Sequence, residues 1–255
     1  MRLEFAGSTH VGMKRNHNED SLLLLPEQNL FIVADGMGGH ASGEVASRLA
    51  VETVAEFFKE TAEDDEVTWP YKLSKDRHYE ENRLINGVML ANLRIWETAT
   101  AEAAKKGMGT TIVTTLFANG GAYVAHVGDS RIYRLGGGKI AQVTEDHSLL
   151  NDYLKMKQLT PEEIESFPHK NVIVRALGMK ETVKVDTNFI KPEVDDIFLM
   201  CSDGLSGMIS DDDMLRIVTA NITNLEQACT ELIAEANANG GVDNITVILA
   251  RFLGN

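Results

Sequence analysis

Acidic residues stand at the ends of short apolar segments at five places in the chain. These segments have the length and composition of buried β-strands, so we expect the acids at the rim of a sheet. Hard oxygen ligands without a cluster of histidines and cysteines favour Mg²⁺ or Mn²⁺ over zinc. The acids are Glu19 and Asp20 before 21–25, Asp35 after 30–34, Asp129 after 122–127, Asp203 after 197–202, and Asp243 before 245–252.

Whether these acids can meet depends on how the strands run. In an antiparallel sheet, the exits of some strands and the entrances of others share one rim, so five or six carboxylates could gather there. A packed domain cannot hold so many negative charges together without cations. Taken singly, each acid is better explained by a turn or a solvated surface, because Asp-Gly is a common turn sequence. The hypothesis of a metal site therefore rests on the whole set.

The stretch FIVADGMGGH at 31–40 contains more glycine than one tight turn requires. Gly36, directly after Asp35, would let its own carbonyl oxygen face a metal ion. The glycines that follow would let the chain pass close to the ligand and to water. The glycine content therefore predicts a binding loop.

The segments that position these residues read as short strands and a few helices. Asn119-Gly120 between two strands predicts a tight hairpin, and 134–143 predicts a second, looser one. Strands with one-sided helices predict a layered α+β domain. Strands are expected at 2–7, 21–25, 30–34, 111–117, 122–127, 131–135, 197–202 and 245–252. Helices are expected at 44–60, 80–106 and 225–238, the last with a capping box of Thr223 and Glu226.

Length and composition narrow the class of protein. The 255 residues suit one domain, 1–255, in which 148–176 reads as an inserted lid with a short helix opening at 160–163. The net charge of −14 argues against nucleic acid and anionic membranes as partners. No apolar run is long enough for a membrane span or a signal peptide, and the two cysteines, Cys201 and Cys229, read as core residues. A cytoplasmic protein is expected.

Eight motifs, taken together and in this order, resemble those of the bacterial metal-dependent protein serine/threonine phosphatases of the type 2C (PPM) family. They are RNHNED, VADGMGGH, GTT, AHVGDSRIYRL, TEDHS, RALG, CSDGL and GGVDNITVILARF. The likeness spans about residues 5–252 and is weakest at 61–105 and 148–176. It implies a four-layer αββα sandwich, with two central antiparallel sheets flanked by helices and a small flap at 148–176.

The resemblance also implies a metal centre. Asp35 would bridge two Mn²⁺ or Mg²⁺ ions, one of which Asp203 and Asp243 would complete. Glu19 and the carbonyl of Gly36 would serve the other ion. A third, weaker ion would lie at Asp129 with Asp203.

Further residues would support this centre. The resemblance implies that Asp20 and Asn244 orient the ligands, and that Thr110 and Thr111 pack beneath them. His126 and His147 are interpreted as structural.

The resemblance also implies which residues contact the substrate. Arg15 matches the arginine that holds the substrate phosphate as a bidentate donor. Met37 stands where eukaryotic members have a histidine, so the proton donor to the leaving oxygen is not at that place. His40 is the candidate to replace it, and the alternative is that it caps the following helix. Side chains near Arg175 would meet the target protein.

The function implied is hydrolysis of phosphoserine and phosphothreonine in proteins by hydroxide bridging two metal ions, without a phosphoenzyme. The substrates would be targets of a serine/threonine kinase, and the enzyme would be a monomer. One alternative is a catalytically silent module of the same fold that binds a signalling partner. Complete acidic ligands argue against it. A metal-dependent nuclease is disfavoured by the net charge and the absence of basic stripes.

Overall fold

The computed structural model describes residues 1–38, 42–63, 68–157, 159–160, 163–164, 167 and 172–254. Within these ranges the strands form two antiparallel sheets. One sheet has the order β1-β11-β10-β7-β8, and the other has the order β2-β3-β5-β6-β9 with β4 paired to β3. The first sheet comprises β1 (Leu3–His10), β7 (Arg131–Gly136), β8 (Lys139–Gln142), β10 (Ile197–Cys201) and β11 (Ile245–Phe252). The second comprises β2 (Asp20–Leu25), β3 (Leu30–Met37), β4 (Gly109–Thr110), β5 (Ile112–Ala118), β6 (Gly121–Val127) and β9 (Asp186–Ile190).

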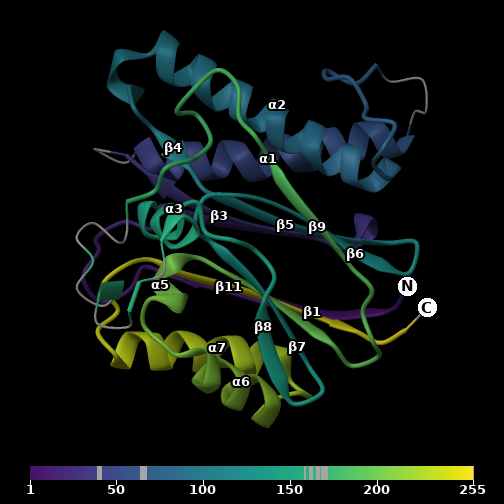
Figure 1. The fold of residues 1–255 in the computed structure, drawn as a ribbon, viewed down its shortest axis with the longest axis vertical. Coiled ribbons are helices and arrows are strands. Elements are labelled where there is room, and N and C mark those ends of the chain that lie inside the picture. Colours follow the sequence, from purple (N-terminus) through teal and green to yellow (C-terminus); the bar gives the residue numbers. More distant parts are fainter. Residues whose placement is uncertain are drawn as a thin grey trace.

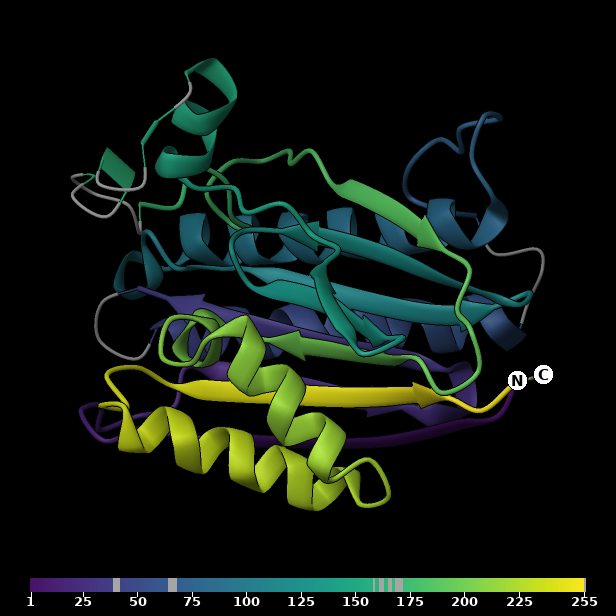
Figure 2. The same ribbon diagram turned by 60° about the horizontal axis from the view of Figure 1, so that its bottom comes forward.

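Helices cover the outer face of each sheet (Figures 1 and 2). Helices α1 (Ser42–Glu63) and α2 (Tyr79–Ala101) pack on the second sheet, whereas α6 (Asp211–Ala220) and α7 (Leu225–Ala238) pack on the first. The two sheets face each other across an apolar core that includes Phe31, Phe117, Phe198, Met200 and Ile248. This arrangement confirms the predicted four-layer sandwich.

Most predicted elements are present, with shifted ends. Helix α2 stops at Ala101 and is followed by a 3-10 turn, Ala103–Lys105, so the predicted end at residue 106 was wrong. Helix α7 has the predicted bounds, but its cap is Asn224, whose side chain accepts from the N–H of Gln227. The predicted cap, Thr223, was therefore wrong by one residue. A further 3-10 turn lies at Pro26–Gln28.

The hairpins follow their turn sequences. Asn119 and Gly120 join β5 to β6 with φ values of 51° and 77°, as a type I′ turn requires. The second hairpin is not looser, because Gly137 and Gly138 alone join β7 to β8, with φ values of 57° and 74°. Glycine supplies the left-handed backbone that such a short connection needs.

The segment 148–176 begins with helix α3 (Leu149–Met156), capped by Ser148. The short helix predicted at 160–163 lies partly outside the described residues. The segment is closed at its base by a bridge between Ser148 and Ile173 and by a hydrogen bond of 2.8 Å from Leu149 N to Val172 O. No helix within the described ranges is long and apolar enough to cross a lipid bilayer.

Candidate active site

Asp20 and Asp35 lie directly opposite each other on the paired strands β2 and β3. The sequence placed Asp35 after its strand and Asp20 before its strand, and both placements were wrong. Strand β3 continues through Met37, and β2 begins at Asp20 itself. Because the two strands are antiparallel, the end of one and the start of the other bring both carboxylates to the same rim.

The backbone of Asp35 is fixed by two threonines. Its carbonyl oxygen accepts from Thr111 N at 2.8 Å and from Thr110 Oγ1 at 2.8 Å, and its N–H donates to Thr111 Oγ1 at 3.1 Å. Thr111 Oγ1 also lies 2.7 Å from Ser130 Oγ, next to Asp129. The threonines thus lie beneath the acids, as predicted, and join the strand of Asp35 to the turn of Asp129.

Asp20 is buried behind the rim. Its Oδ2 accepts from Ser202 Oγ at 2.7 Å and from Thr246 Oγ1 at 2.6 Å, while its Oδ1 has no partner among the residues that the structure describes. Burial raises the pKa of Asp20 to about 7, with repulsion from Asp203 and Asp243 adding to the effect and the two hydroxyls opposing it. The sequence analysis missed Ser202 and Thr246, although each is a hydroxyl residue at the rim end of an apolar strand.

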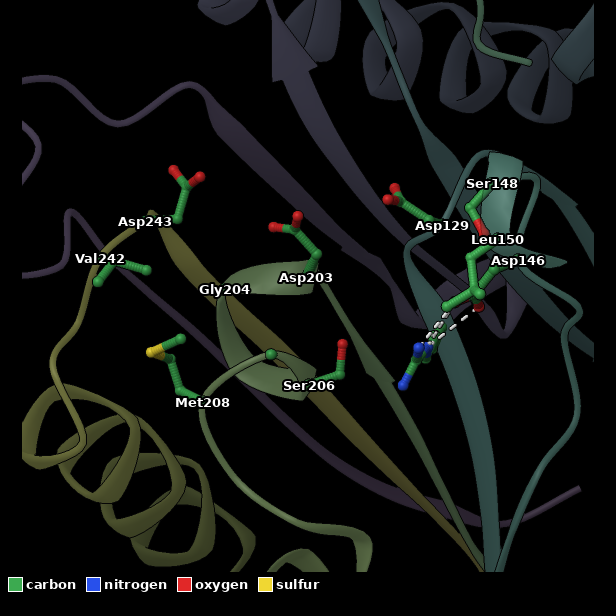
Figure 3. A pocket seen from close by; sticks show the side chains of 12 residues that line it. Asp129, Asp146, Ser148, Leu150, Asp203, Gly204, Ser206, Met208, Val242 and Asp243 are labelled. Carbon is green, nitrogen blue, oxygen red and sulfur yellow. Dashed lines mark hydrogen bonds and ion pairs between the residues drawn. The ribbon is translucent and has the colours of Figure 1, made fainter. Parts of the chain in front are cut away.

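The other acids converge from separate segments. Asp203 opens the short helix α5 (Asp203–Ser206) after β10, Asp129 follows β6, and Asp243 precedes β11. Their side chains project to the same side of a cleft of about 470 Å³ (Figure 3). Arg131, which forms an ion pair with Asp146, lines another part of this cleft.

The pKa values of these carboxyl groups are raised because the groups are buried and lie close to one another. Burial, followed by repulsion from Asp20 and Asp203, raises the pKa of Asp35 well above its ordinary value. Burial also raises the pKa of Asp129 to about 7, with Asp203 contributing. The pKa of Asp203 is raised by burial and by Asp243, and a hydrogen bond to Asp35 opposes the rise. Carboxyl groups so arranged favour protons or cations.

Asn244 ties the loop before β2 to the start of β11. It is buried, its Oδ1 accepts from Glu19 N at 2.8 Å, and its Nδ2 donates to Val11 O and His17 O at 3.0 and 2.9 Å. Arg15, on the same loop, pairs with Asp243 across 2.6 Å between Nη2 and Oδ2, and its side chain is half exposed. The loop therefore brings Glu19 and Arg15 to the acidic rim.

Gly36 has a second reason for being glycine that the sequence did not reveal. A Cβ there would lie 2.2 Å from the carbonyl oxygen of Gly43 in helix α1 and 2.5 Å from that of Glu19. A Cβ on Gly43 would in turn lie 2.9 Å from Glu19 Oε2. The two glycines let strand, helix and the Glu19 loop meet at the rim, where the Gly36 carbonyl was predicted to bind metal.

The acidic residues fit divalent cations. Asp20 and Asp129 each have a buried carboxylate oxygen without a hydrogen-bond partner in the described part of the chain. The donors offered at the rim are carboxylate and carbonyl oxygens, which suit Mg²⁺ or Mn²⁺. His40 lies outside the described residues, so its role stays a prediction.

The raised pKa values predict that the metal-free protein loses stability as pH rises. In the unfolded chain these aspartates have pKa values of about 3.9, whereas those of Asp20 and Asp129 are about 7 in the folded protein. The protonated folded form is favoured at low pH, and this advantage is lost as pH rises through about 7. Each group contributes roughly 1.4 kcal/mol per pH unit between pH 5 and 7, so in EDTA we expect the free energy of unfolding to fall by about 5 kcal/mol between pH 5 and 8.

Urea unfolding at several pH values measures this slope. Asp20→Asn, which removes one titrating group, should flatten it, and Mn²⁺ should stabilise wild type most at high pH. A metal-free protein as stable at pH 8 as at pH 5 would contradict the assignment.

Comparisons with known proteins agree with this geometry. The family profile described as "Protein phosphatase 2C" matches residues 6–239. The "Serine/threonine phosphatase stp" of Listeria innocua is 38% identical over 257 residues, covering 98% of this chain and 95% of the relative.

Solved structures give the same result. The serine/threonine phosphatase PstP/Ppp of Mycobacterium tuberculosis superimposes with a TM-score of 0.85 at 32% identity, covering 99% of both chains. The catalytic domain of PstP in complex with two manganese ions gives a TM-score of 0.80 at 33% identity, covering 98% of this chain and 97% of that one. Sequence and fold therefore agree: the chain belongs to the protein phosphatase 2C family of metal-dependent serine/threonine phosphatases.

Proposed function

We propose that this protein removes phosphate from phosphoserine and phosphothreonine in other proteins, using divalent cations held at the acidic rim. The observation that carries the proposal is the convergence of buried, mutually repelling carboxylates with unpartnered oxygens. The residues proposed to hold the cations are Glu19, Asp35, the carbonyl of Gly36, Asp129, Asp203 and Asp243, with two ions expected at the centre and a weaker third at Asp129. Mn²⁺ and Mg²⁺ are both suited to these ligands. When bound, the cations supply positive charge to the phosphate oxygens and lower the pKa of a coordinated water.

The chain's own residues would bind and orient the substrate. Arg15 presents a planar guanidinium at the edge of the site, where it can donate two hydrogen bonds to a phosphate. Its ion pair with Asp243 sets the direction of the side chain. Asn244 would hold the loop that carries Arg15 and Glu19 against the start of β11, and Asp20 would hold the rim ends of the strands together, through the hydrogen bonds described above. His40 remains the proposed proton donor to the leaving oxygen.

No cysteine is suited to form a phosphoenzyme. Cys201 and Cys229 are buried, and burial raises the pKa of each thiol to about 12. Because the thiolate is the reactive form, both are inert at neutral pH. Water is therefore the proposed nucleophile, in keeping with direct hydrolysis.

We further propose that residues 1–255 act as one catalytic domain, with 148–176 as a flap near the substrate. The acidic ligands come from elements of both sheets, so neither sheet could supply the site alone. A monomer acting in the cytoplasm on the targets of a serine/threonine kinase is proposed as its setting. A silent binding module is less well supported, because every predicted acidic ligand is present.

A substrate panel tests the proposal. The purified protein, loaded with Mn²⁺ or Mg²⁺, is given peptides carrying phosphothreonine, phosphoserine or phosphotyrosine, together with single- and double-stranded DNA. We expect phosphate release from the first two peptides and no cleavage of DNA. Metal-loaded protein that binds phosphopeptides without releasing phosphate would support the silent module, and cleavage of DNA would support a nuclease.

Arg15→Lys should weaken substrate binding more than it slows turnover. Lysine keeps the positive charge but cannot donate two parallel hydrogen bonds to the phosphate, as a guanidinium can. Loss of one hydrogen bond to a charged group costs about 1.5–3 kcal/mol, which corresponds to a rise in KM of roughly 10- to 100-fold. Steady-state kinetics with a phosphothreonine peptide measure the change. Lys14→Ala is the matched control, since it removes an exposed positive charge one residue away. A KM that is unchanged, or equally raised by both variants, would contradict the role of Arg15.

A further inference from the structure

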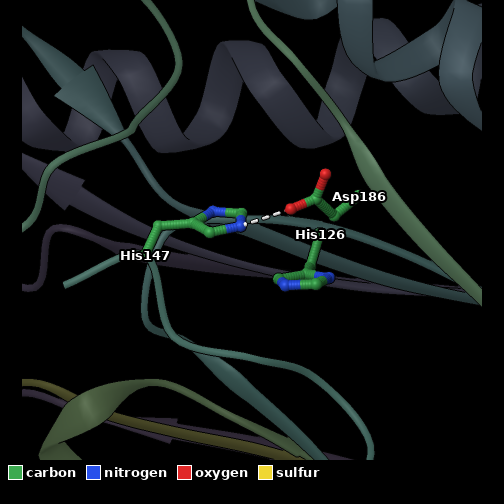
Figure 4. Close-up of side chains that lie close together, drawn as sticks. All are labelled: His126, His147 and Asp186. Carbon is green, nitrogen blue, oxygen red and sulfur yellow. Dashed lines mark hydrogen bonds and ion pairs between the residues drawn. The ribbon is translucent and has the colours of Figure 1, made fainter. Parts of the chain in front are cut away.

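A cluster of side chains outside the acidic rim has the composition of a metal site. His126, His147 and Asp186 form the only group of three possible ligands, within the described ranges, whose donor atoms all lie within 4.8 Å of one another (Figure 4). The two imidazole rings are stacked, with centroids 4.8 Å apart and planes 12° from parallel. An imidazole lone pair lies in the plane of its ring, so two stacked rings cannot both point at one ion. Arg175 Nη1 also lies 2.9 Å from His147 Nε2 and would repel a cation.

His147 instead clamps the turn that carries Asp129. Its backbone N–H donates to Gly128 O at 2.9 Å, and its side-chain Nδ1 accepts from Gly128 N at 3.0 Å. Gly128 has a φ of +110°, and a Cβ there would lie 2.6 Å from the side chain of Thr111. The turn is therefore tightly constrained on both sides, directly before Asp129.

The proton of His147 has a defined place. Burial lowers the pKa of His147 to about 4, so the ring is neutral at physiological pH. Since Nδ1 accepts from Gly128, we assign the proton of the neutral ring to Nε2, which lies 2.9 Å from Asp186 Oδ2. Arg175 Nη1 and Lys184 Nζ also contact the Asp186 carboxylate, at 2.9 and 3.1 Å. The far side of the ring is thus held by strand β9 and its neighbours.

The same histidine joins the turn to the base of the segment 148–176. Val174 N donates to His147 O at 2.9 Å, beside the bridge between Ser148 and Ile173. His126, stacked on His147, contacts the backbone of Glu145 through Nε2 at 2.9 Å. Both histidines were predicted to be structural, and these contacts show that His147 supports the backbone at Gly128, next to Asp129.

We propose that His147 is a positioning residue for Asp129, and that its Nδ1 bond to Gly128 sets the affinity of the divalent cation that Asp129 holds with Asp203. This inference rests on the proposed function and adds a residue to it. The argument is geometric: Nδ1 fixes the backbone one residue before the ligand, whereas Nε2 faces away toward Asp186.

Two amide variants separate the two nitrogens, because each places a polar atom near only one of them. In His147→Asn the amide oxygen can take the place of Nδ1, and in His147→Gln the amide N–H can take the place of Nε2. Mn²⁺ binding is measured directly from the electron paramagnetic resonance of free Mn²⁺, alongside the Mn²⁺ dependence of peptide dephosphorylation. Asp129→Asn, which removes the ligand itself, marks the full loss of the weak ion.

We expect His147→Gln to raise the Mn²⁺ concentration for half-occupancy of the weakest site about 10- to 100-fold, as loss of a group orienting a ligand does. The tighter sites should be unchanged, and excess Mn²⁺ should recover turnover. His147→Asn should stay within about twofold of wild type, because the bond to Gly128 is kept. A role in folding alone would lower the melting temperature of both variants without this selective shift.

The outcomes distinguish the inference from the proposed function. Equal affinity changes in both variants, or none in His147→Gln, would overturn the inference. If His147→Gln does not fold, Asp186→Asn takes its place, because it leaves the bond between His147 and Gly128 intact. A lower Mn²⁺ affinity at the weakest site in Asp186→Asn would overturn the inference, and an unchanged affinity would support it. A wild-type protein that binds no Mn²⁺ and releases no phosphate would instead overturn the proposed function.

Discussion

Removal of divalent cations with EDTA should reduce dephosphorylation of a phosphothreonine peptide to the uncatalysed background, and added Mn²⁺ should restore it. Without cations, the crowded carboxylates at the rim present negative charge to a phosphate dianion. Among the described residues, Arg15 is the only cationic side chain that forms an ion pair with one of the acids proposed as ligands, and its partner is Asp243. We expect a loss of at least about 1,000-fold, since electrostatic stabilisation and the activated water both depend on the ions.

The measurement is an initial rate after chelation and gel filtration, followed by titration with Mn²⁺ and, separately, Mg²⁺. Recovery with excess metal serves as the control for irreversible damage by the chelator. The number of ions per chain is determined on the same samples by elemental analysis. Activity that persists in protein free of bound metal would rule out the mechanism.

Asp203→Asn should produce the second large effect. Asp203 opens helix α5 directly after β10, and it interacts with two other acids of the rim, by repulsion with Asp243 and through a hydrogen bond with Asp35. The amide keeps the shape of the side chain but loses the charge that a cation requires. We expect kcat/KM to fall by more than about 100-fold, the upper end of what loss of a group orienting a metal ligand costs. The number of bound Mn²⁺ ions should fall as well.

The same substitution should stabilise the metal-free protein. Removing one of several buried like charges relieves repulsion, so the melting temperature in EDTA should rise at pH 8 while activity falls. Asp213→Asn, on the exposed first turn of α6, is the matched control and should leave activity and metal content unchanged. A metal-loaded Asp203→Asn with wild-type turnover would contradict the ligand assignment.

The sequence allowed the layered fold and the convergence of acids to be predicted because both follow from short-range patterns. Apolar strands with acids at their ends, and turns such as Asn119-Gly120, carry that information locally. The exact end of β3 could not be predicted, because Asp35-Gly36 has the composition of a turn. The strand continues there because β4, from a distant part of the chain, pairs with it, Gly36 opposite Thr110 and Met37 opposite Gly109.

Other features were missed for similar reasons. Strand β9 lies at an edge of its sheet and has only half-buried and exposed residues, without alternation, so no pattern marks it. Helix α6 did carry signals, since Ser210 caps it and Met214, Ile217 and Val218 form an apolar face. The bonds of His147 to Gly128 bridge two loops, and nothing in the local sequence of either loop specifies them.

The pairing of the first strand with the last has a consequence for how the enzyme matures. Strands β1 and β11 are matched over their full length, from Leu3 opposite Phe252 to His10 opposite Ile245. A chain emerging from a ribosome therefore holds β1 without β11 until residue 252 has been made, and contacts so distant in sequence form slowly. Since Asp243 and Asn244 directly precede β11, we expect a nascent chain to lack the proposed acidic site, and so to leave phosphoproteins intact, until β11 has been synthesised.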